Sequence, residues 1–222
     1  MQNTSSIETD NTSTEIVDNM CAPAKALKRI CDFIGAALAM VLSSPLYLYI
    51  ALRLKLTEKG KVIFKQERIG LGGKPFLIYK FRTLSEGFED NGPRLTPCED
   101  KAHVTGFGKF LRVHHLDELP QLFNVFAGQM SFVGPRPEVP KYVDMYDEVQ
   151  KNVLLVRPGI TDEASIVFRD ENEILENAEN PEKAYIEEIM PVKLAYNLEY
   201  ITKMSLFYNI KLIFKTIIAV LK

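Results

Sequence analysis

Two adjacent carboxylates and one constrained arginine lie in the short stretch from Leu116 to Pro137. Asp117 and Glu118 precede an amphipathic run, and Arg136 is held between two prolines in a Gly-Pro-Arg-Pro turn. Carboxylates can hold a metal ion or attack phosphorus, and a fixed guanidinium can clamp phosphate oxygens. The combination predicts a phosphate-handling site. The acidic pair taken alone would equally suit the first turn of a helix, where it complements the helix dipole.

Further cations flank this stretch. Lys80 and Arg82 alternate with aromatic residues, so a strand there would have one apolar and one cationic face. That face could bind phosphate, or it could simply be solvated. Arg112 lies shortly before Asp117, where it could orient the acidic pair or bind phosphate. For Arg136, phosphate binding and capping of helix carbonyls remain equally open.

The composition excludes some classes of protein. The chain has 222 residues, with 27 Lys and Arg against 29 Asp and Glu, a net charge of -2. This balance, without a base-stacking module, argues against a nucleic-acid binder. Three widely spaced cysteines argue against a disulfide framework and a cysteine zinc site. Residues 1–24, rich in Ser, Thr, Asn and acids at the start, are expected to form a disordered tail.

An apolar segment, residues 25–56, precedes the candidate site. Phe33 to Leu52 contains no charge and is long enough to cross a bilayer. Ser44-Pro45 interrupts it, and basic residues flank both of its ends, so the positive-inside rule selects no orientation for a simple span. A re-entrant helix, broken at Ser44 and Pro45 and leaving on the side it entered, resolves this conflict. The alternatives are a true span and a buried helix of a soluble domain.

The remaining chain, residues 57–222, is predicted to be one cytosolic catalytic domain, a helix-rich α/β fold with a small irregular sheet. The expected elements are strands at 61–66 and 75–81 around a glycine turn, a polar loop at 85–100, helices at 105–112 and 137–152, a turn into a strand or loop at 157–161, and helices over 171–203 interrupted at Pro181 and Pro191.

The C-terminus reads as a basic amphipathic helix. Lys211 and Lys215 share one face of an otherwise apolar segment. Such a helix suits the surface of an anionic membrane. A helix that packs against the core of the domain is the alternative.

Five motifs in order resemble the bacterial sugar transferases, the small monotopic phosphoglycosyl transferases. The resemblance covers roughly residues 28–220. Its motifs are KRICDFIGA (28–36), the Ser44-Pro45 break, FKQERIGLGGKPFLIYKFRTL (64–84), LRVHHLDELPQLFNVFAGQMSFVGPRP (111–137) and RPGIT (157–161).

The resemblance implies an enzyme that transfers sugar-1-phosphate from a nucleoside diphosphate sugar, usually a UDP-sugar, to polyprenol phosphate, with release of the nucleoside monophosphate. It implies Mg2+, a covalent aspartyl phospho-sugar, contact with membrane lipids, and a place on the cytoplasmic face of the bacterial inner membrane at the start of glycan assembly. A homo-oligomer is left open. The alternative is a non-catalytic membrane scaffold, against which the intact acidic pair argues.

The resemblance also assigns roles to residues. Asp117 matches the nucleophile, and Glu118 matches its neighbour, which would bind metal or manage protons; both are candidate Mg2+ ligands. Lys80, Arg82, Arg112 and Arg136 match basic positions, and Arg169 aligns with a phosphate-binding arginine.

The chain departs from the family's common pattern at three positions. Asp162 stands where many members have glycine, and Asn197 and Asn209 stand where many have aspartate. These departures leave the acidic pair intact. They indicate a distinct substrate subgroup, and they put the sugar pocket and the role of Arg169 in question.

Overall fold

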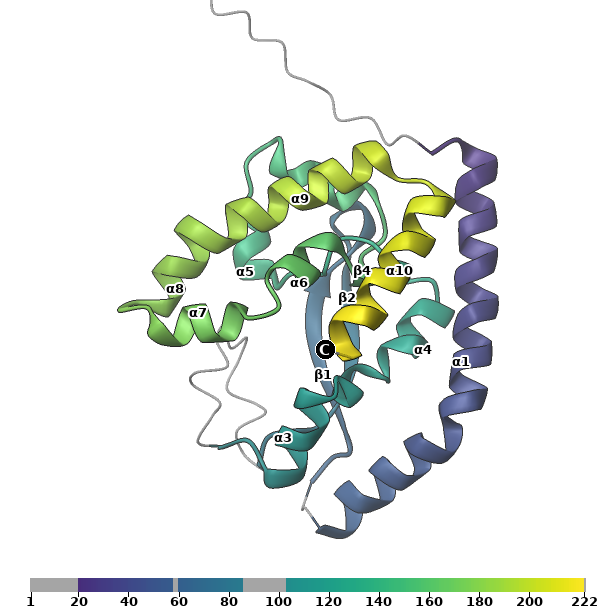
Figure 1. The fold of residues 1–222 in the computed structure, drawn as a ribbon, viewed down its shortest axis with the longest axis vertical. Coiled ribbons are helices and arrows are strands. Elements are labelled where there is room, and N and C mark those ends of the chain that lie inside the picture. The colour runs from purple at the N-terminus through teal and green to yellow at the C-terminus, as the bar shows by residue number, and fades with distance from the viewer. Residues whose placement is uncertain (1–19, 58–59, 86–102, 222) are drawn as a thin grey trace, which may run out of the picture.

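The structure is a computed structural model that describes residues 20–57, 60–85 and 103–221. Most of the predicted N-terminal tail and the predicted polar loop at 85–100 lie outside this range. Figure 1 shows one long helix at the side of a mixed body of helices and short strands. This agrees with the predicted helix-rich α/β class.

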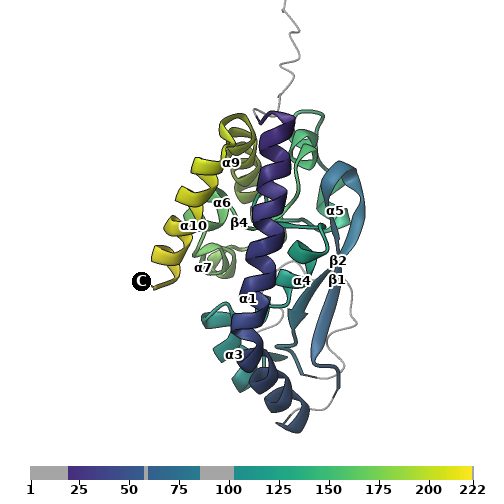
Figure 2. The ribbon, with the colours of Figure 1, turned by 90° about the vertical axis from the view of Figure 1, so that its right-hand side faces the viewer.

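The long helix, α1 (Ala22–Thr57), contacts the domain through one narrow stripe. Ala36, Ile50 and Leu54 on that stripe are fully or almost fully buried, whereas Val41 and Leu42 are 70% and 80% exposed. Figure 2 shows α1 running along the whole length of the domain. In the described part of the chain it alone is long and apolar enough to cross a membrane, with a mean hydropathy of 1.8. A large apolar face of α1 therefore has no cover in the monomer.

The helix bends in its second half but remains helical through Pro45. A proline cannot donate to the carbonyl four residues earlier, which here belongs to Val41. The Ser44 hydroxyl donates to that Val41 carbonyl at 2.7 Å, and the Ser43 hydroxyl donates to the carbonyl of Ala39 at 2.6 Å. Ser44 thus replaces the lost bond, and the expected break is a bend. Re-entry into a membrane remains a prediction.

Contacts before and after the bend fix α1 to the domain. The Arg29 guanidinium donates to the carbonyls of Val125 and Phe126 at 2.7 and 2.8 Å, at the C-terminal end of α4 (Gln121–Phe126). A cation at this end of a helix satisfies free carbonyls. After the bend, the Tyr47 hydroxyl donates to the backbone carbonyl of Leu119. The bent part of α1 therefore reaches the turn that carries the acidic pair.

The strands form two separate pairs. β1 (Ile63–Ile69) and β2 (Pro75–Phe81) are antiparallel, with Phe64 opposite Lys80, and are joined by a 3-10 turn, η1 (Leu71–Gly73). β3 (Ser131–Val133) and β4 (Gly159–Thr161) are parallel. Both predicted strands around the glycine turn are confirmed, and of the strand or loop predicted near 157–161 a strand forms. The parallel pair brings the Gly-Pro-Arg-Pro turn beside the chain that follows Thr161.

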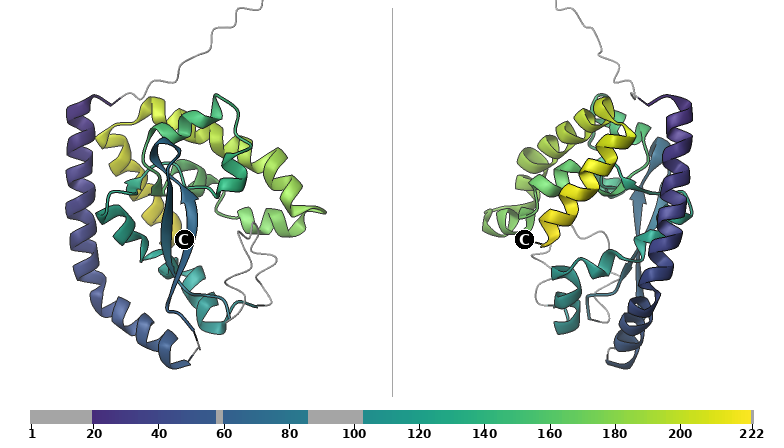
Figure 3. Two further views of the ribbon diagram at one scale, coloured as in Figure 1. Left: turned by 180° about the vertical axis from the view of Figure 1, so that it is seen from behind. Right: turned by 45° about the vertical axis from the view of Figure 1, so that its right-hand side comes forward.

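The remaining helices surround these strands (Figure 3). Helix α3 (Gly106–Val113) confirms the prediction at 105–112, and the Thr105 hydroxyl caps it by accepting from the Gly108 amide at 2.9 Å. The others are α5 (Pro140–Val143), η4 (Gln150–Leu155), α6 (Glu163–Val167), α7 (Glu171–Asn177), α8 (Pro181–Ala184), η5 (Tyr185–Ile189), α9 (Met190–Lys203) and α10 (Leu206–Leu221).

The helix predicted over 137–152 is wrong: only the single turn α5 and the later 3-10 segment η4 form. The Asp147 amide donates to the Gln150 side chain at 3.0 Å, and the Gln150 amide donates to the Asp147 carboxylate at 2.7 Å. This reciprocal pair resembles a capping box and starts a new turn where a helix would have continued. Tyr142 and Tyr146 from this segment are buried in the core, whereas Val149 is 52% exposed.

Of the two predicted interruptions, the one at Pro181 is confirmed, because α7 ends at Asn177 and α8 begins at Pro181, and the one at Pro191 is wrong. Pro181 begins α8, as prolines often do at a first helical position. Pro191 follows the π-helical turn η5 and lies in the first turn of α9, without a gap between them. A wider turn just before a proline tolerates the missing N–H.

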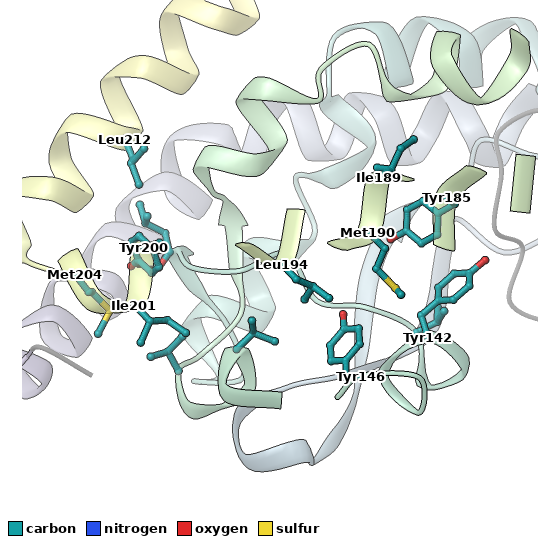
Figure 4. Close-up of a cluster of buried hydrophobic side chains, with 14 of the residues drawn as sticks. Tyr142, Tyr146, Tyr185, Ile189, Met190, Leu194, Tyr200, Ile201, Met204 and Leu212 are labelled. Atoms are coloured by element: carbon teal, nitrogen blue, oxygen red, sulfur yellow. Dashed lines mark hydrogen bonds between the residues drawn. The ribbon is translucent and has the colours of Figure 1, made fainter. Parts of the chain in front are cut away.

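The largest core cluster lies between α9, α10 and the chain around α5 (Figure 4). Tyr200, Ile201 and Leu212 in this cluster are at most 1% exposed. Helix α10 packs into the core through Leu212, yet Phe207 on the same helix is 79% exposed. The buried face of α10 agrees with the core-packing alternative, and contact of its exposed apolar face with a membrane remains a prediction.

The close approach of the two parallel strands gives a testable prediction. A Cβ on Gly134 would lie 2.3 Å from the Arg157 carbonyl oxygen, whereas a Cβ on Gly106 would meet nothing within 4 Å. We expect Gly134→Ala to lower the free energy of unfolding by about 1–3 kcal/mol, because backbone atoms must move apart. Gly106→Ala is the matched control and should be neutral or stabilising by about 0.4–1 kcal/mol. Equal melting temperatures for the two variants would contradict the prediction.

Candidate active site

The acidic pair lies on a short 3-10 turn, η3 (Leu116–Glu118), directly after α3. His115 enters this turn with a left-handed backbone, φ 52°, and so reverses the direction of the chain at the end of α3. Successive residues of a 3-10 turn point about 120° apart. Asp117 and Glu118 nevertheless both line one cavity of about 800 Å³.

Glu118 is fully engaged by two cations. Its Oε1 accepts from Lys80 Nζ at 2.8 Å and from Arg136 Nη2, and its Oε2 accepts from Arg136 Nη1 at 3.2 Å. Arg136 is therefore bidentate, the strongest arrangement of this ion pair. Burial acts to raise the pKa of Glu118, but the charges and hydrogen bonds of Arg136 and Lys80 outweigh it and hold that pKa well below its usual range. Glu118 is thus held ionised.

Asp117 has the opposite environment. Its side chain is buried, with the residue 8% exposed, and it forms no hydrogen bond or ion pair with any described residue. Burial raises the pKa of Asp117 above its usual value, although the nearby charge of Lys80 opposes this shift. A desolvated carboxylate without a protein partner is available to a ligand, and such a group is a good candidate for a nucleophile.

The other predicted cations line the same cavity. Arg82 follows β2 and is 1% exposed, and Arg112 donates from Nε to the Thr83 hydroxyl at 2.9 Å. Arg169 lines the cavity from the chain just after α6. All seven predicted catalytic and phosphate-binding residues therefore meet at one cavity: Lys80, Arg82, Arg112, Asp117, Glu118, Arg136 and Arg169. Ser44 and Pro45 lie on α1 and are not among its lining residues.

Sequence reasoning missed a second polar cluster in this cavity. Arg68 on β1 donates to the Pro137 carbonyl at 3.0 Å and pairs with Glu138 at 3.2 Å. The Tyr185 hydroxyl donates to the other oxygen of Glu138. Arg68 and Glu138 do lie in or next to the motifs that suggested the family. Their pairing, however, joins positions 70 residues apart, and no local pattern reveals it.

The two carboxylates do not fit a magnesium ion equally well. No group of three or more metal-ligating side chains occurs among the described residues. Mg2+ needs only one or two carboxylates when phosphate oxygens and water supply the rest. Asp117 meets that need, because its oxygens have no protein partner. Glu118 does not, since Arg136 and Lys80 already use its oxygens.

Asp162 is one of the departures from the common family pattern. It supports the Gly-Pro-Arg-Pro turn that carries Arg136. Its Oδ2 accepts from the Arg136 backbone amide at 3.1 Å, and its Oδ1 caps α6 by accepting from the Ser165 amide at 2.7 Å. A glycine could make neither bond. Asn209 has a structural role too, because its Oδ1 accepts from the Tyr200 hydroxyl at 2.7 Å.

Comparison with known proteins agrees with this geometry. The family model described as bacterial sugar transferase matches residues 23–222. A UDP-glucose:undecaprenyl-phosphate glucose-1-phosphate transferase of Klebsiella pneumoniae is 39% identical over 194 residues, which are 86% of this chain and 39% of that protein. A UDP-N-acetylgalactosamine-undecaprenyl-phosphate N-acetylgalactosaminephosphotransferase of Aeromonas hydrophila is 36% identical over 198 residues, 88% of this chain and 44% of that protein.

A relative of similar length also exists. The uncharacterized sugar transferase EpsL of Bacillus subtilis is 36% identical over 195 residues, 88% of this chain and 87% of that protein. The chain spans about two fifths of the length of the longer curated relatives. The family match over residues 23–222 covers all but the first residue of α1, both pairs of strands and the whole cavity. The chain belongs to the bacterial sugar transferase family.

Proposed function

We propose that this protein transfers sugar-1-phosphate from a UDP-sugar to polyprenol phosphate and releases UMP. The observation that carries the proposal is the contrast within the acidic pair. Asp117 has no partner among the described residues and lines a cation-rich cavity, while Glu118 is ionised and paired. The names of the relatives, which specify UDP-sugars and undecaprenyl phosphate, support the choice of substrates.

In the first half-reaction, a carboxylate oxygen of Asp117 attacks the phosphorus that bears the sugar. The bond from that phosphorus to the bridging oxygen breaks, and UMP leaves with the electron pair. The sugar-1-phosphate is then held on Asp117 as an acyl phosphate. In the second half-reaction, a phosphate oxygen of polyprenol phosphate attacks the same phosphorus and returns Asp117 to a free carboxylate. The product is a polyprenyl diphosphate sugar.

The positive side chains offset the repulsion between Asp117 and an anionic diphosphate. Arg136 and Lys80 are held at Glu118, beside Asp117, and Arg82 and Arg112 line the same cavity. Phosphoryl transfer depends mainly on such positioning and charge stabilisation. A bound Mg2+, for which Asp117 is the fitting protein ligand, would neutralise further negative charge on the diphosphate.

The uncovered face of α1 supports a membrane location. Its exposed apolar residues suit the acyl region of a bilayer, and Tyr47 connects the same helix to the turn of the acidic pair. A site next to the membrane surface would let a lipid phosphate meet a soluble nucleotide sugar. We place the domain on the cytoplasmic face of the bacterial inner membrane, because both ends of α1 carry basic residues.

Replacement of Asp117 tests the reaction. Asp117→Asn should lower UMP release from UDP-sugars by at least about 10³-fold, because an amide cannot act as the nucleophile. Labelled sugar-1-phosphate should be retained covalently by the wild-type protein in the absence of lipid acceptor, and not by the variant. Asp144→Asn, which changes an exposed carboxylate, is the control and should keep full activity. UMP release by Asp117→Asn at the wild-type rate would refute the proposal; failure of the wild-type protein with all UDP-sugars would favour a scaffold.

The pairing of Glu118 predicts a pH-dependent stability. Because the pKa of Glu118 is lower in the folded protein than in the unfolded chain, its ionic contacts stabilise the fold at neutral pH, and this stabilisation fades as the pH falls through the folded-state pKa. Glu118→Gln should therefore cost about 1.5–3 kcal/mol at pH 7, the usual effect of losing charge-assisted hydrogen bonds in a partly buried pair. The difference from wild type should shrink on acidification. Chemical denaturation across pH measures it, and a pH-independent difference would argue against the ionic pairing.

A further inference from the structure

The cavity extends well beyond the acidic pair and its cations. Its far wall is formed by α6 and α9, which pack against each other, and the final turns of α10 contribute Thr216, Ala219 and Val220. Figure 1 shows α6 beside both α9 and α10. A diphosphate bound at Lys80 and Arg136 would leave this wall for the uncharged part of the substrate.

Two polar side chains on this wall lack partners. Asn197 on α9 is 6% exposed, and its amide makes no hydrogen bond with any described residue. The Ser165 hydroxyl on α6 is buried and likewise has no hydrogen-bond partner in the described structure. A buried polar group without a partner costs about 1–3 kcal/mol. Both residues line the cavity, so a ligand that enters it can supply the missing hydrogen bonds.

The charged neighbour of Asn197 on the same wall is already compensated. Lys193, one turn before Asn197 on α9, pairs with Glu171 at 2.9 Å and lies over the Tyr185 ring, 5.4 Å from its centroid. The hydroxyl and the amide therefore dominate the unsatisfied polar groups of this wall. An amide can both donate and accept hydrogen bonds, and a hydroxyl can do the same. These groups match the hydroxyls of an uncharged sugar.

Resting on the proposed function, we propose that Asn197 and Ser165 form the subsite that recognises the sugar of the nucleotide-sugar donor, and that this sugar is a neutral hexose or N-acetylhexosamine. Asp162 supports the subsite. Its carboxylate accepts from the Ser165 amide at 2.7 Å and from the Arg136 amide at 3.1 Å. One side chain therefore connects the wall that carries Ser165 to the turn that carries Arg136. Asn197, which departs from the common aspartate, adds no charge to this wall.

The test compares sugar selectivity with nucleotide affinity. In full-length protein in lipid nanodiscs, kcat/KM is measured for UDP-glucose, UDP-galactose, UDP-N-acetylglucosamine and UDP-N-acetylgalactosamine, and the inhibition constant is measured for UMP, which lacks the sugar. Asn197→Leu should lower kcat/KM for the preferred sugar by at least about tenfold. It should also change the ratio of that kcat/KM to the values for the other sugars, because the hydrogen bonds that distinguish one sugar from another are lost. The UMP inhibition constant should change less than about threefold.

Two further variants keep the test decisive. Asn197→Leu should melt at or above the wild-type temperature, because it removes an unpaired buried amide; a large loss of stability would show that the amide is satisfied within the fold and would overturn the proposal. Ser165→Ala should shift selectivity in the same assay. Asn177→Leu, at an exposed asparagine on α7, is the matched control and should leave all values unchanged.

The remaining outcomes are also distinct. Equal losses for all four sugars together with a weaker UMP affinity would assign Asn197 to the nucleotide and overturn the proposal. Unchanged selectivity in both variants would indicate that ordered water alone satisfies these groups, and would overturn it as well. Failure of the proposed function is separate, since it would show as no UMP release by the wild-type protein with any sugar.

Discussion

The site depends on one ion-pair network, in which Glu118 holds Arg136 through two hydrogen bonds and Lys80 through a third. The network joins three elements that are far apart in sequence: the end of β2, the turn η3 and the Gly-Pro-Arg-Pro turn. Buried charges are tolerated only when they are paired and hydrogen-bonded. The pairing of Glu118 therefore concentrates positive charge beside Asp117 while it leaves Asp117 itself available.

The backbone around the network is built to hold this geometry. Gly134 and Gly159 approach so closely that a side chain on either would collide with the other strand, and the Gly134 amide donates to the Thr161 carbonyl at 3.1 Å. Asp162 then fixes the Arg136 amide. Each of these strands has only three residues, and two residue pairs join them, yet this short ladder brings Arg136 within hydrogen-bonding distance of Asp162.

Helix α1 combines two demands that usually conflict. Its exposed side chains suit lipid, while Arg29 and Tyr47 bind backbone carbonyls of the domain. The bend at Pro45 reconciles them. It redirects the second half of the helix so that Ile50 and Leu54 pack against Phe81 and Leu111, next to the site. Ser44 lowers the energetic cost of the bend in an apolar medium, because the Val41 carbonyl that Pro45 leaves free is still hydrogen-bonded.

The sequence alone indicated a phosphate-handling site and the class of fold. The types and positions of acidic and basic residues suggested most of the side chains that line the cavity, the resemblance to the family added Arg169, and apolar length with a serine–proline step identified α1. Local pattern was insufficient where contacts across the chain compete with it. One helix is predicted over 137–152, but only the single turn α5 and the segment η4, which begins at the Asp147–Gln150 turn, form.

Tertiary structure decided which member of the acidic pair is free. In the sequence, Asp117 and Glu118 are equivalent carboxylates, and Arg136 suits a phosphate or a helix end equally well. The folded chain pairs Arg136 with Glu118 and leaves Asp117 buried and unpartnered among the described residues. The physical reason is that the pKa and availability of a carboxylate depend on burial and on charges within a few ångströms, and residues distant in the sequence supply both.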